Sequence, residues 1–309
     1  MKFLAVVNPL AAGGKGLAAI SRLRVALDRT GHSCQWKITD SLSDIQSSIL
    51  AASESGVGGV LIVGGDGTIS HALPALLKTD LPVGIIPCGR GNDFARNVGL
   101  PLEMVEAATF PDRPVTRMVD IATVNDRPFA SVACLGFDAR VNELANKPHR
   151  IFKGRSVFIY SVLRALRDFE PFEVDMTIDN DTWRGSIMMA AIANGSCYGG
   201  GMRIAPQADM EDGLLNICII RKTRKWTLLK ELPSVFRGTH TDHPDVLMLT
   251  GKRIRITSVT KQAVFADGEP ITHLPLICTV GKHYLKILQP HIQMLIGGEH
   301  AQRSRQAYR

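Results

Sequence analysis

The chain has 309 residues, a length typical of two domains rather than of one ordinary core. Hydrophobic residues make up 45% and charged residues 21%, which describes a soluble globular protein and excludes a chain too polar to fold. The formal net charge of +7 suits an anionic partner, such as a nucleotide, a nucleic acid or an anionic membrane, without choosing among them.

Two further features of the composition bear on location. The six cysteines are scattered without a CxxC pair, and most lie in apolar runs, so we expect reduced core residues of a cytoplasmic protein. No apolar stretch approaches the ~20 residues that are needed to span a bilayer, so a membrane-spanning helix is not expected.

The first third of the chain alternates short apolar runs with amphipathic stretches. Strands are predicted at 3–7, 36–39, 60–63 and 83–86. Helices are predicted at 17–29, from 43 to about 52, at 69–77 and shortly after residue 92. This alternation predicts a parallel sheet with helices on its faces, in which ligands bind beyond the carboxyl ends of the strands.

Three glycine-rich segments fall at those strand ends: NPLAAGGKG, GGDGT and CGRGND. Glycine lets backbone N–H groups approach an anion closely, and a helix N-terminus behind the loop adds its dipole. One such segment is usually a simple turn, but three on one edge favour a phosphate site. The patterns GxGxxG and GxxxxGK[ST] are absent, so neither dinucleotide hydride chemistry nor Walker-type hydrolysis is favoured.

The pattern changes near Arg117. Short apolar runs are now separated mostly by turns, which predicts an antiparallel β domain, with helices expected only at Ser156–Phe169 and Trp226–Phe236. We therefore expect an α/β nucleotide-binding domain at 1–117 and a β-sandwich lipid-binding domain at 118–285. Residues 286–309 are expected to return to the first domain and to end in a basic tail.

Six motifs occur in one order along residues 1–290: NP…GG…G, GGDGT, PxGxGNDFAR, IANGSCYGGGM, DGLL and DGEP. Together they resemble the diacylglycerol-kinase-type catalytic domain of bacterial lipid kinases and of diacylglycerol, sphingosine and ceramide kinases. The resemblance implies ATP-dependent phosphorylation of a lipid hydroxyl with Mg2+. It also implies an α/β nucleotide domain, a β-sandwich domain and an active site in the cleft between them.

The candidate nucleotide site follows from the glycine-rich segments. The loops at Asn8–Ala12 and Gly64–Thr68 would supply N–H donors to the phosphates. Its candidate residues are Asn8, Pro9, Leu10, Ala11, Ala12, Gly64, Gly65, Asp66, Gly67, Thr68 and Arg90. The resemblance adds Thr39, for which the residues alone favour a position near a helix N-cap. Asn92 and Asp93 would also suit an N-cap.

Three acidic residues are candidates for the chemistry. Asp66 sits among glycines, where its carboxylate could reach Mg2+ or the acceptor hydroxyl, or could merely stabilise a turn. Asp267 and Glu269 would share a face if their segment is extended. The resemblance gives the general-base role to Glu269, and the alternative is an ordinary Asp-Gly turn with a solvated glutamate.

The resemblance also implies a second, structural Mg2+ bound by Asp209, Asp212 and Leu214, where a hydrated acidic turn is equally compatible with the residues. The basic stretch Lys147–Arg155 precedes an amphipathic helix and would contact anionic lipid headgroups or form a solvated face. The expected partners are ATP and a lipid at a membrane surface, with no nucleic acid. The expected location is cytoplasmic with peripheral membrane association, and a homodimer is left open.

Two departures from the family pattern keep alternatives open. Arg90 stands where relatives usually have Thr or Ser, and Ser70-His71 replaces a common Asn-Glu. Arg90 could contact phosphate as a charged donor or could block the nucleotide pocket. A non-catalytic nucleotide- or lipid-binding relative and an NAD kinase-like enzyme therefore remain alternatives. The retained Asp66 and Glu269 argue against the first, and the DGEP and NGxxxGGG motifs argue against the second.

Overall fold

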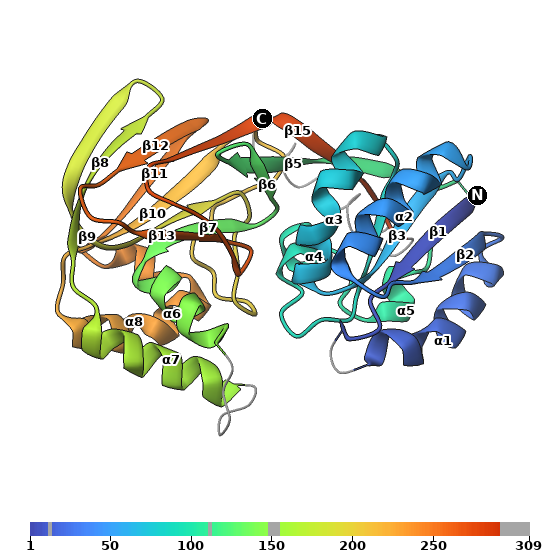
Figure 1. Cartoon of the computed structure of the whole chain (residues 1–309), viewed down its shortest axis with the longest axis horizontal. Coiled ribbons are helices and arrows are strands. Elements are labelled where there is room, and N and C mark those ends of the chain that lie inside the picture. The colour runs from blue at the N-terminus through green and yellow to red at the C-terminus, as the bar shows by residue number, and fades with distance from the viewer. Residues whose placement is uncertain (12–13, 111–112, 148–154, 291–309) are drawn as a thin grey trace, which may run out of the picture. The chain divides into compact units, whose positions relative to one another are not determined.

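The structure is a computed structural model that describes residues 1–11, 14–110, 113–147 and 155–290 (Figure 1). The chain divides into two compact units. Unit 1 comprises Met1–Val119 and the chain from Tyr284 onward, and unit 2 comprises Asp120–His283. For comparison, the sequence places the change of pattern at 117 and the return segment at 286.

Unit 1 is built on a parallel sheet in the order β2-β1-β3-β4-β15. Its strands are β1 (Lys2–Val7), β2 (Ser33–Ile38), β3 (Gly59–Gly64) and β4 (Val83–Pro87), completed by the end of β15 (Leu276–Leu288). Every residue of β3 and β4 is buried, as expected for strands whose apolar runs are continuous.

The helices of unit 1 are α1 (Lys15–Arg29), α2 (Leu42–Glu54), α3 (Asp66–Thr79), α4 (Asp93–Asn97) and α5 (Met104–Ala107). The α2 helix begins after Ser41, whose hydroxyl accepts a hydrogen bond from the N–H of Asp44. The α3 helix begins three residues before the predicted start at residue 69. The GGDGT segment therefore runs from the last residue of β3, Gly64, through the N-cap Gly65 into the first turn of α3, and does not form a free loop.

Unit 2 is an antiparallel β structure. Its strands are β5 (Thr116–Val124), which begins in unit 1, β6 (Arg127–Phe129), β7 (Val132–Gly136), β8 (Phe172–Ile178), β9 (Asp181–Ala193), β10 (Leu215–Arg221), β11 (Val246–Gly251), β12 (Arg253–Thr257), β13 (Ala263–Ala266), β14 (Glu269–His273) and the first part of β15. The long β9 strand organises this unit, because it pairs with β8 along its first half and with β7 and β10 along its second.

The helices of unit 2 lie on one side of its strands (Figure 1). They are α6 (Phe137–Ala145), α7 (Arg155–Asp168) and α8 (Lys225–Arg237), followed by a short 3-10 helix at Thr239–Asp242. The sequence predicts α7 and α8 but not α6. Among the described residues, no helix combines the length and apolarity that a membrane crossing requires.

The strand β15 serves both units. Its first residues pair antiparallel with β12, and Ile287 near its end pairs in parallel with Val83 of β4. A parallel sheet covered by helices, followed by an antiparallel β unit, confirms the expected fold class.

Candidate active site

The first feature of the site is a close backbone contact between two glycines of unit 1. A Cβ on Gly65 would lie 2.8 Å from the Cα of Gly89, and a Cβ on Gly89 would lie 2.6 Å from the Cα of Gly65. Gly64 and Cys88 also join the two segments through a backbone hydrogen bond of 3.0 Å. The GGDGT and CGRGND segments therefore pack directly on each other, and this contact requires glycine at both positions.

Gly67 differs from Gly65, because a Cβ there would meet nothing within 4 Å. It is exposed and lies in the first turn of α3, where backbone N–H groups have no partner within the helix. This open helix N-terminus can bind an anion.

Asp66 connects the same two segments through its side chain. Its Oδ1 accepts a hydrogen bond of 3.0 Å from the backbone N–H of Phe94, at the start of α4. Burial raises the pKa of the Asp66 carboxyl, and hydrogen bonds from the backbone N–H groups of Phe94, Asp93 and Asn92 oppose that rise. The carboxylate is thus held at the meeting point of two helix N-termini, α3 and α4.

Asn92 precedes α4 but does not cap it with its side chain. Its φ is +54°, and its side-chain amide instead exchanges two hydrogen bonds with the backbone of Gly89. Asn92 therefore occupies the N-cap position that the sequence suggests, but its side chain makes no cap hydrogen bond, and Asp66 accepts from an N–H at that end of the helix. Arg90 is exposed, and its guanidinium makes no hydrogen bond or ion pair within the part of the chain that the structure describes.

Asn8 brings the first loop to α3. Its Nδ2 donates to the hydroxyl of Thr68 at 2.9 Å, and its Oδ1 accepts from the N–H of Leu10 at 3.0 Å. Pro9, Leu10 and Ala11 follow in the same loop, with Leu10 84% exposed, whereas Ala12 lies outside the described residues.

Thr39 follows β2. It is 3% exposed, and its hydroxyl donates to the carbonyl of Val7 at 3.1 Å. The N-cap of the next helix is Ser41, two residues further on, so Thr39 lies near a helix N-cap as the residues alone suggest. Its contact with a nucleotide stays a prediction.

In unit 2, the acids of the DGEP motif separate into two environments. Asp267 and Gly268 form a two-residue turn between β13 and β14, with φ values of +50° and +83°. The segment is therefore not extended at Asp267, and the expectation that Asp267 and Glu269 share a face does not hold. The Asp267 carboxylate accepts from the backbone N–H groups of Ala130, Ser131 and Val132, at 2.7, 2.8 and 3.3 Å.

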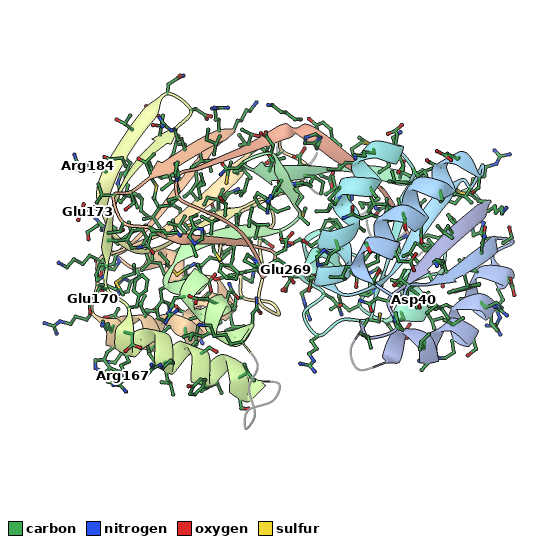
Figure 2. All side chains as sticks on the ribbon, viewed as in Figure 1. Asp40, Arg167, Glu170, Glu173, Arg184 and Glu269 are labelled. Carbon is green, nitrogen blue, oxygen red and sulfur yellow. The ribbon has the colours of Figure 1, made fainter. Side chains whose placement is uncertain are left out.

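Glu269 begins β14 and is half-buried (Figure 2). Within the described residues, its carboxylate has no hydrogen bond or ion pair. The Asn146 side chain donates to the carbonyl of Gly268 at 3.0 Å and fixes the turn beside it. The rigid Asp-Gly turn thus presents a free carboxylate at its end.

Asn194, in the NGSCYGGG motif, is fully buried. Its Nδ2 donates to the carbonyls of Asp120 and Ala130, both at 2.8 Å. Asn194 and Asp267 therefore hold the same backbone segment around residues 130–132 from two sides. This structural role of the motif is not apparent from the sequence, because both contacts depend on strand pairing.

The residues expected to bind a structural Mg2+ lie near the carboxylate of Asp120, which no motif in the sequence indicates. Asp120 Oδ2 accepts from the N–H of Gly213 at 2.8 Å, and burial, together with the charges of Asp212 and Asp209, raises its pKa. Asp209 and Asp212 accept from the N–H groups of Glu211 and Leu214. Among the described residues, no group of three or more side chains is arranged to hold a metal, and metal binding here stays a prediction.

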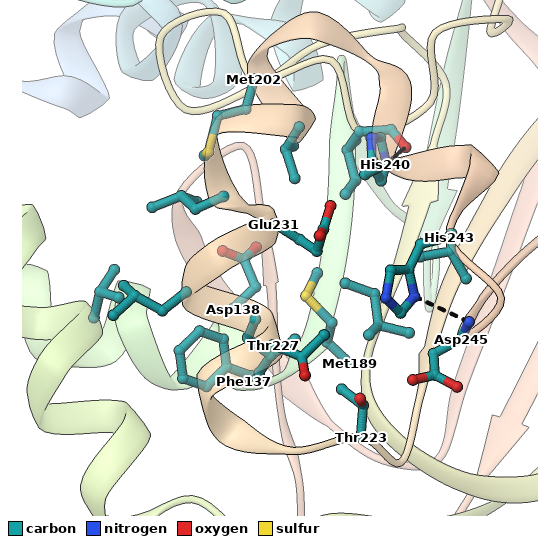
Figure 3. Close-up of a pocket in the computed structure, with 18 of the residues that line it drawn as sticks. Phe137, Asp138, Met189, Met202, Thr223, Thr227, Glu231, His240, His243 and Asp245 are labelled. Carbon is teal, nitrogen blue, oxygen red and sulfur yellow. Dashed lines mark hydrogen bonds between the residues drawn. The ribbon is translucent and has the colours of Figure 1, made fainter.

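Unit 2 also contains an apolar cavity of about 80 Å3. Its walls come from the inner sides of α6, α7 and α8 and from β9 and β10 (Figure 3). Most lining side chains are apolar, including Val141, Leu166, Met189, Leu228, Leu232 and Val235. The close-up shows three acids among the lining residues: Asp138 of α6, Glu231 of α8 and Asp245.

Asp138 is the unusual member of this lining. It is 8% exposed, and its Oδ2 is buried without a hydrogen-bond partner in the described structure. Burial raises the pKa of its carboxyl, although hydrogen bonds with Cys134 and Tyr198 oppose the rise. Asp138 is not among the site residues predicted from the sequence. The only signal in the sequence is its position two residues after the apolar run that forms β7.

Comparisons with known proteins place this site in a family. Residues 2–124 match the model of the diacylglycerol kinase catalytic domain. Residues 131–289 match the YegS C-terminal NAD kinase beta sandwich-like domain. The chain belongs to the diacylglycerol-kinase-type lipid kinase family. The boundary between the two matches falls near the division of the chain at residues 119 and 120.

Individual relatives agree with this assignment. A diacylglycerol kinase of Mycobacterium tuberculosis is 32% identical over 301 residues, which cover 94% of this chain and 95% of the relative. A diacylglycerol kinase of Bacillus subtilis is 28% identical over 216 residues, which cover 68% of this chain and 70% of the relative. A crystal structure of a diacylglycerol kinase from Bacillus anthracis shares the fold, with a TM-score of 0.71 and 21% identity. The match covers 94% of this chain and 97% of that structure's chain.

Proposed function

We propose that this member of the lipid kinase family transfers the γ-phosphoryl group of ATP to a lipid hydroxyl, with Asp66 and Glu269 as its catalytic carboxylates. The observation that carries the proposal is the environment of Asp66. Its carboxylate is fixed at the junction of the GGDGT and GNDFAR segments, beside an open helix N-terminus that can receive phosphate.

The phosphates of ATP would bind at the start of α3 and in the loop after β1. The open surface at Gly67 gives a phosphate oxygen access to backbone N–H groups. Arg90, in the adjacent segment, has a guanidinium free of partners within the described structure and would contribute a charged donor. The hydrogen bond from Asn8 to Thr68 keeps the two phosphate-binding segments together.

The donors present fit a Mg2+ ion bound mainly by the nucleotide. Mg2+ in kinases is commonly held by one or two carboxylates together with substrate phosphates. Asp66 offers one such carboxylate, whose orientation is fixed by the N–H of Phe94. The ion would neutralise developing charge on the phosphates.

Glu269 would act as the general base. Its carboxylate is free of partners within the described structure, and the Asp-Gly turn fixes the backbone on which it stands. Asp267 is unsuited to this role because three backbone N–H groups already occupy its carboxylate. As the base, the Glu269 carboxylate would accept the proton of the lipid hydroxyl as the hydroxyl oxygen attacks the γ-phosphate.

The apolar cavity in unit 2 supports an amphiphilic acceptor. Its volume of about 80 Å3 is smaller than the ~150 Å3 of an engineered apolar cavity that admits benzene. An acyl chain would therefore enter only if α7 or α8 moved outward. The unpartnered Oδ2 of Asp138 would accept a hydrogen bond from a polar group of the lipid.

The test is incubation of labelled ATP and Mg2+ with diacylglycerol, a sphingoid base and phosphatidylglycerol in mixed micelles, followed by thin-layer chromatography. A labelled lipid that depends on both Asp66 and Glu269 supports the proposal. ATP binding without any labelled lipid would favour the non-catalytic relative, and labelled NADP formed from NAD would favour the NAD kinase-like alternative.

A further inference from the structure

The helices α7 and α8 of unit 2 carry large apolar side chains on their outer sides as well as on their inner sides. Their inner sides supply Val162, Leu166, Leu232 and Val235 to the core and the cavity. On the outer side of α7, Ile159 is 60% and Leu163 51% exposed. An amphipathic surface helix normally turns polar side chains to solvent, so this outer face needs a separate explanation.

The same pattern occurs on α8. Trp226 is 73% exposed, and Lys230, Pro233 and Arg237 follow it at helical spacing along one exposed stripe. The two helices are tied together where α7 ends and α8 begins. The Nζ of Lys225 lies 2.8 Å from the Glu170 carboxylate and 3.3 Å from the Arg167 carbonyl.

Exposed cations lie on the same two helices and on the turn between β10 and α8. The exposed cations on the two helices and the turn before α8 are Arg164, Arg167, Lys222, Arg224, Lys230 and Arg237. Two exposed acids accompany them, and both have cationic partners. Asp168 lies 3.4 Å from Arg164 and 3.6 Å from Arg167, and Glu170 pairs with Lys225. Figure 2 labels Arg167 and Glu170 at this edge of the unit.

We propose that the outer surface formed by α7 and α8, termed the α7–α8 face, docks unit 2 on an anionic lipid bilayer. Exposed Leu, Ile and Trp side chains among Lys and Arg are the pattern by which helices lie in the interface of an anionic membrane. Trp226 would sit at the headgroup level, where its ring is favoured. The cations would contact lipid phosphates.

Charge decides between a bilayer and a second copy of the chain. A two-fold symmetric dimer through the α7–α8 face would bring its excess of cations against the same cations of the other copy. An anionic surface neutralises that excess instead. This assignment moves the membrane contact from the basic stretch at 147–155, of which residues 148–154 lie outside the described structure, to the described helices.

Vesicle binding tests the proposal without ATP or turnover, so its result is separable from that of the kinase assay. The full chain is sedimented with vesicles of phosphatidylcholine alone or of phosphatidylcholine and phosphatidylglycerol in equal parts. We expect binding to the anionic vesicles only, weakened at high salt. The double variant Leu163→Ser/Trp226→Ser should lower the partition coefficient at least ~tenfold. In the double variant Lys230→Glu/Arg237→Glu, each charge reversal should lower the partition coefficient about fivefold or more.

Matched controls lie elsewhere on the same unit. Val259 is 99% exposed in the loop after β12, and the Arg184 side chain is 76% exposed on β9. Val259→Ser and Arg184→Glu should bind vesicles as the unchanged chain does, within about twofold. Circular dichroism and gel filtration confirm that each variant folds.

A spectroscopic readout covers the case in which a variant fails to fold. The chain has three tryptophans, of which Trp226 is the most exposed. Anionic vesicles should shift tryptophan emission to shorter wavelength in the unchanged chain but not in Trp226→Phe. Equal binding to both vesicle types, unaltered binding of both double variants, or a dimer that these variants dissociate would each overturn the proposal.

Discussion

The Oδ1 atom of Asp66 accepts a hydrogen bond of 3.0 Å from the backbone N–H of Phe94. A side chain in the first turn of α3 thus provides the acceptor for a backbone donor in the first turn of α4. This contact spans two sequence motifs, GGDGT and GNDFAR. It also means that Asp66 has a structural as well as a proposed catalytic role. Variants of Asp66 must therefore be designed to separate the two.

Asp66→Asn separates them, because an asparagine Oδ1 can still accept from Phe94 while the negative charge is lost. We expect a folded protein that binds ATP but phosphorylates lipid at least ~100-fold more slowly, since the charge that orients Mg2+ or the acceptor is gone. Lipid phosphorylation and far-UV circular dichroism together measure this. Turnover near that of the unchanged chain would reduce Asp66 to a structural residue.

The raised pKa of Asp66 predicts a pH dependence of stability. An acid whose pKa is higher in the folded than in the unfolded state stabilises the fold at pH below its unfolded value, and this contribution is lost as pH rises through the folded pKa. Asparagine does not ionise, so Asp66→Asn does not lose stability as pH rises through this pKa. The stability of the variant relative to the unchanged chain should therefore be greater at pH 7 than at pH 4. Urea unfolding at both values measures the difference, and a constant or reversed difference would contradict the stated direction.

Gly65 and Gly67 form a matched pair of glycines two residues apart. In Gly65→Ala the new Cβ would lie 2.8 Å from the Cα of Gly89, so we expect a loss of about 1–3 kcal/mol in unfolding free energy. In Gly67→Ala the new Cβ meets nothing within 4 Å and the helix gains an alanine, so stability should hold or rise by up to ~1 kcal/mol.

We expect ATP affinity to respond to Gly67→Ala although stability does not. The added methyl of Gly67→Ala would project where phosphate is proposed to bind, so its ATP affinity should fall while its stability does not. Calorimetric titration with ATP and urea unfolding of both variants measure this contrast. Unchanged ATP affinity in Gly67→Ala would place the phosphates elsewhere.

The local parts of this fold were predictable, because they depend on spacing within short segments. Continuous apolar runs predicted β3 and β4, and helical spacing predicted α7 and α8. The start of α3 was predicted too late, because glycines at 65 and 67 are read as a turn. The Gly65–Gly89 packing that accommodates them depends on two segments separated by more than twenty residues.

The candidate site was predictable as a set of motifs but not as a set of contacts. The sequence groups Asp267 with Glu269 because alternation places them on one face, yet a turn separates them and commits Asp267 to three backbone N–H groups. Asp138 escaped prediction because its burial without a full set of partners arises only when α6, α7 and α8 pack together.

Substitution of Asp267 should therefore lower the free energy of unfolding, whereas substitution of Glu269 should not. Asp267→Ala leaves buried backbone donors unsatisfied and should lower the free energy of unfolding by about 2 kcal/mol or more. Glu269→Gln removes no described contact and should leave stability within about 0.5 kcal/mol. Urea denaturation of both variants measures this, and equal destabilisation would show that Glu269 also has a structural partner.

Arg90→Thr tests the departure from the family pattern. If Arg90 donates to phosphate, the change should weaken ATP binding about tenfold, the value of one charge-assisted hydrogen bond, and leave turnover at saturating ATP nearly intact. Initial rates at varied ATP concentration measure both quantities. If instead the unchanged chain is inactive and the Arg90→Thr variant is active, Arg90 blocks the nucleotide pocket.

The general-base role of Glu269 is the central claim, and the turnover rate of Glu269→Gln at saturating ATP and lipid tests it most directly. General-base loss typically costs ~10²–10⁴ in rate, so kcat should fall by that factor while ATP affinity stays nearly unchanged. A fall of less than about tenfold, or a collapse of ATP affinity instead, would contradict the account and move the base role to Asp66.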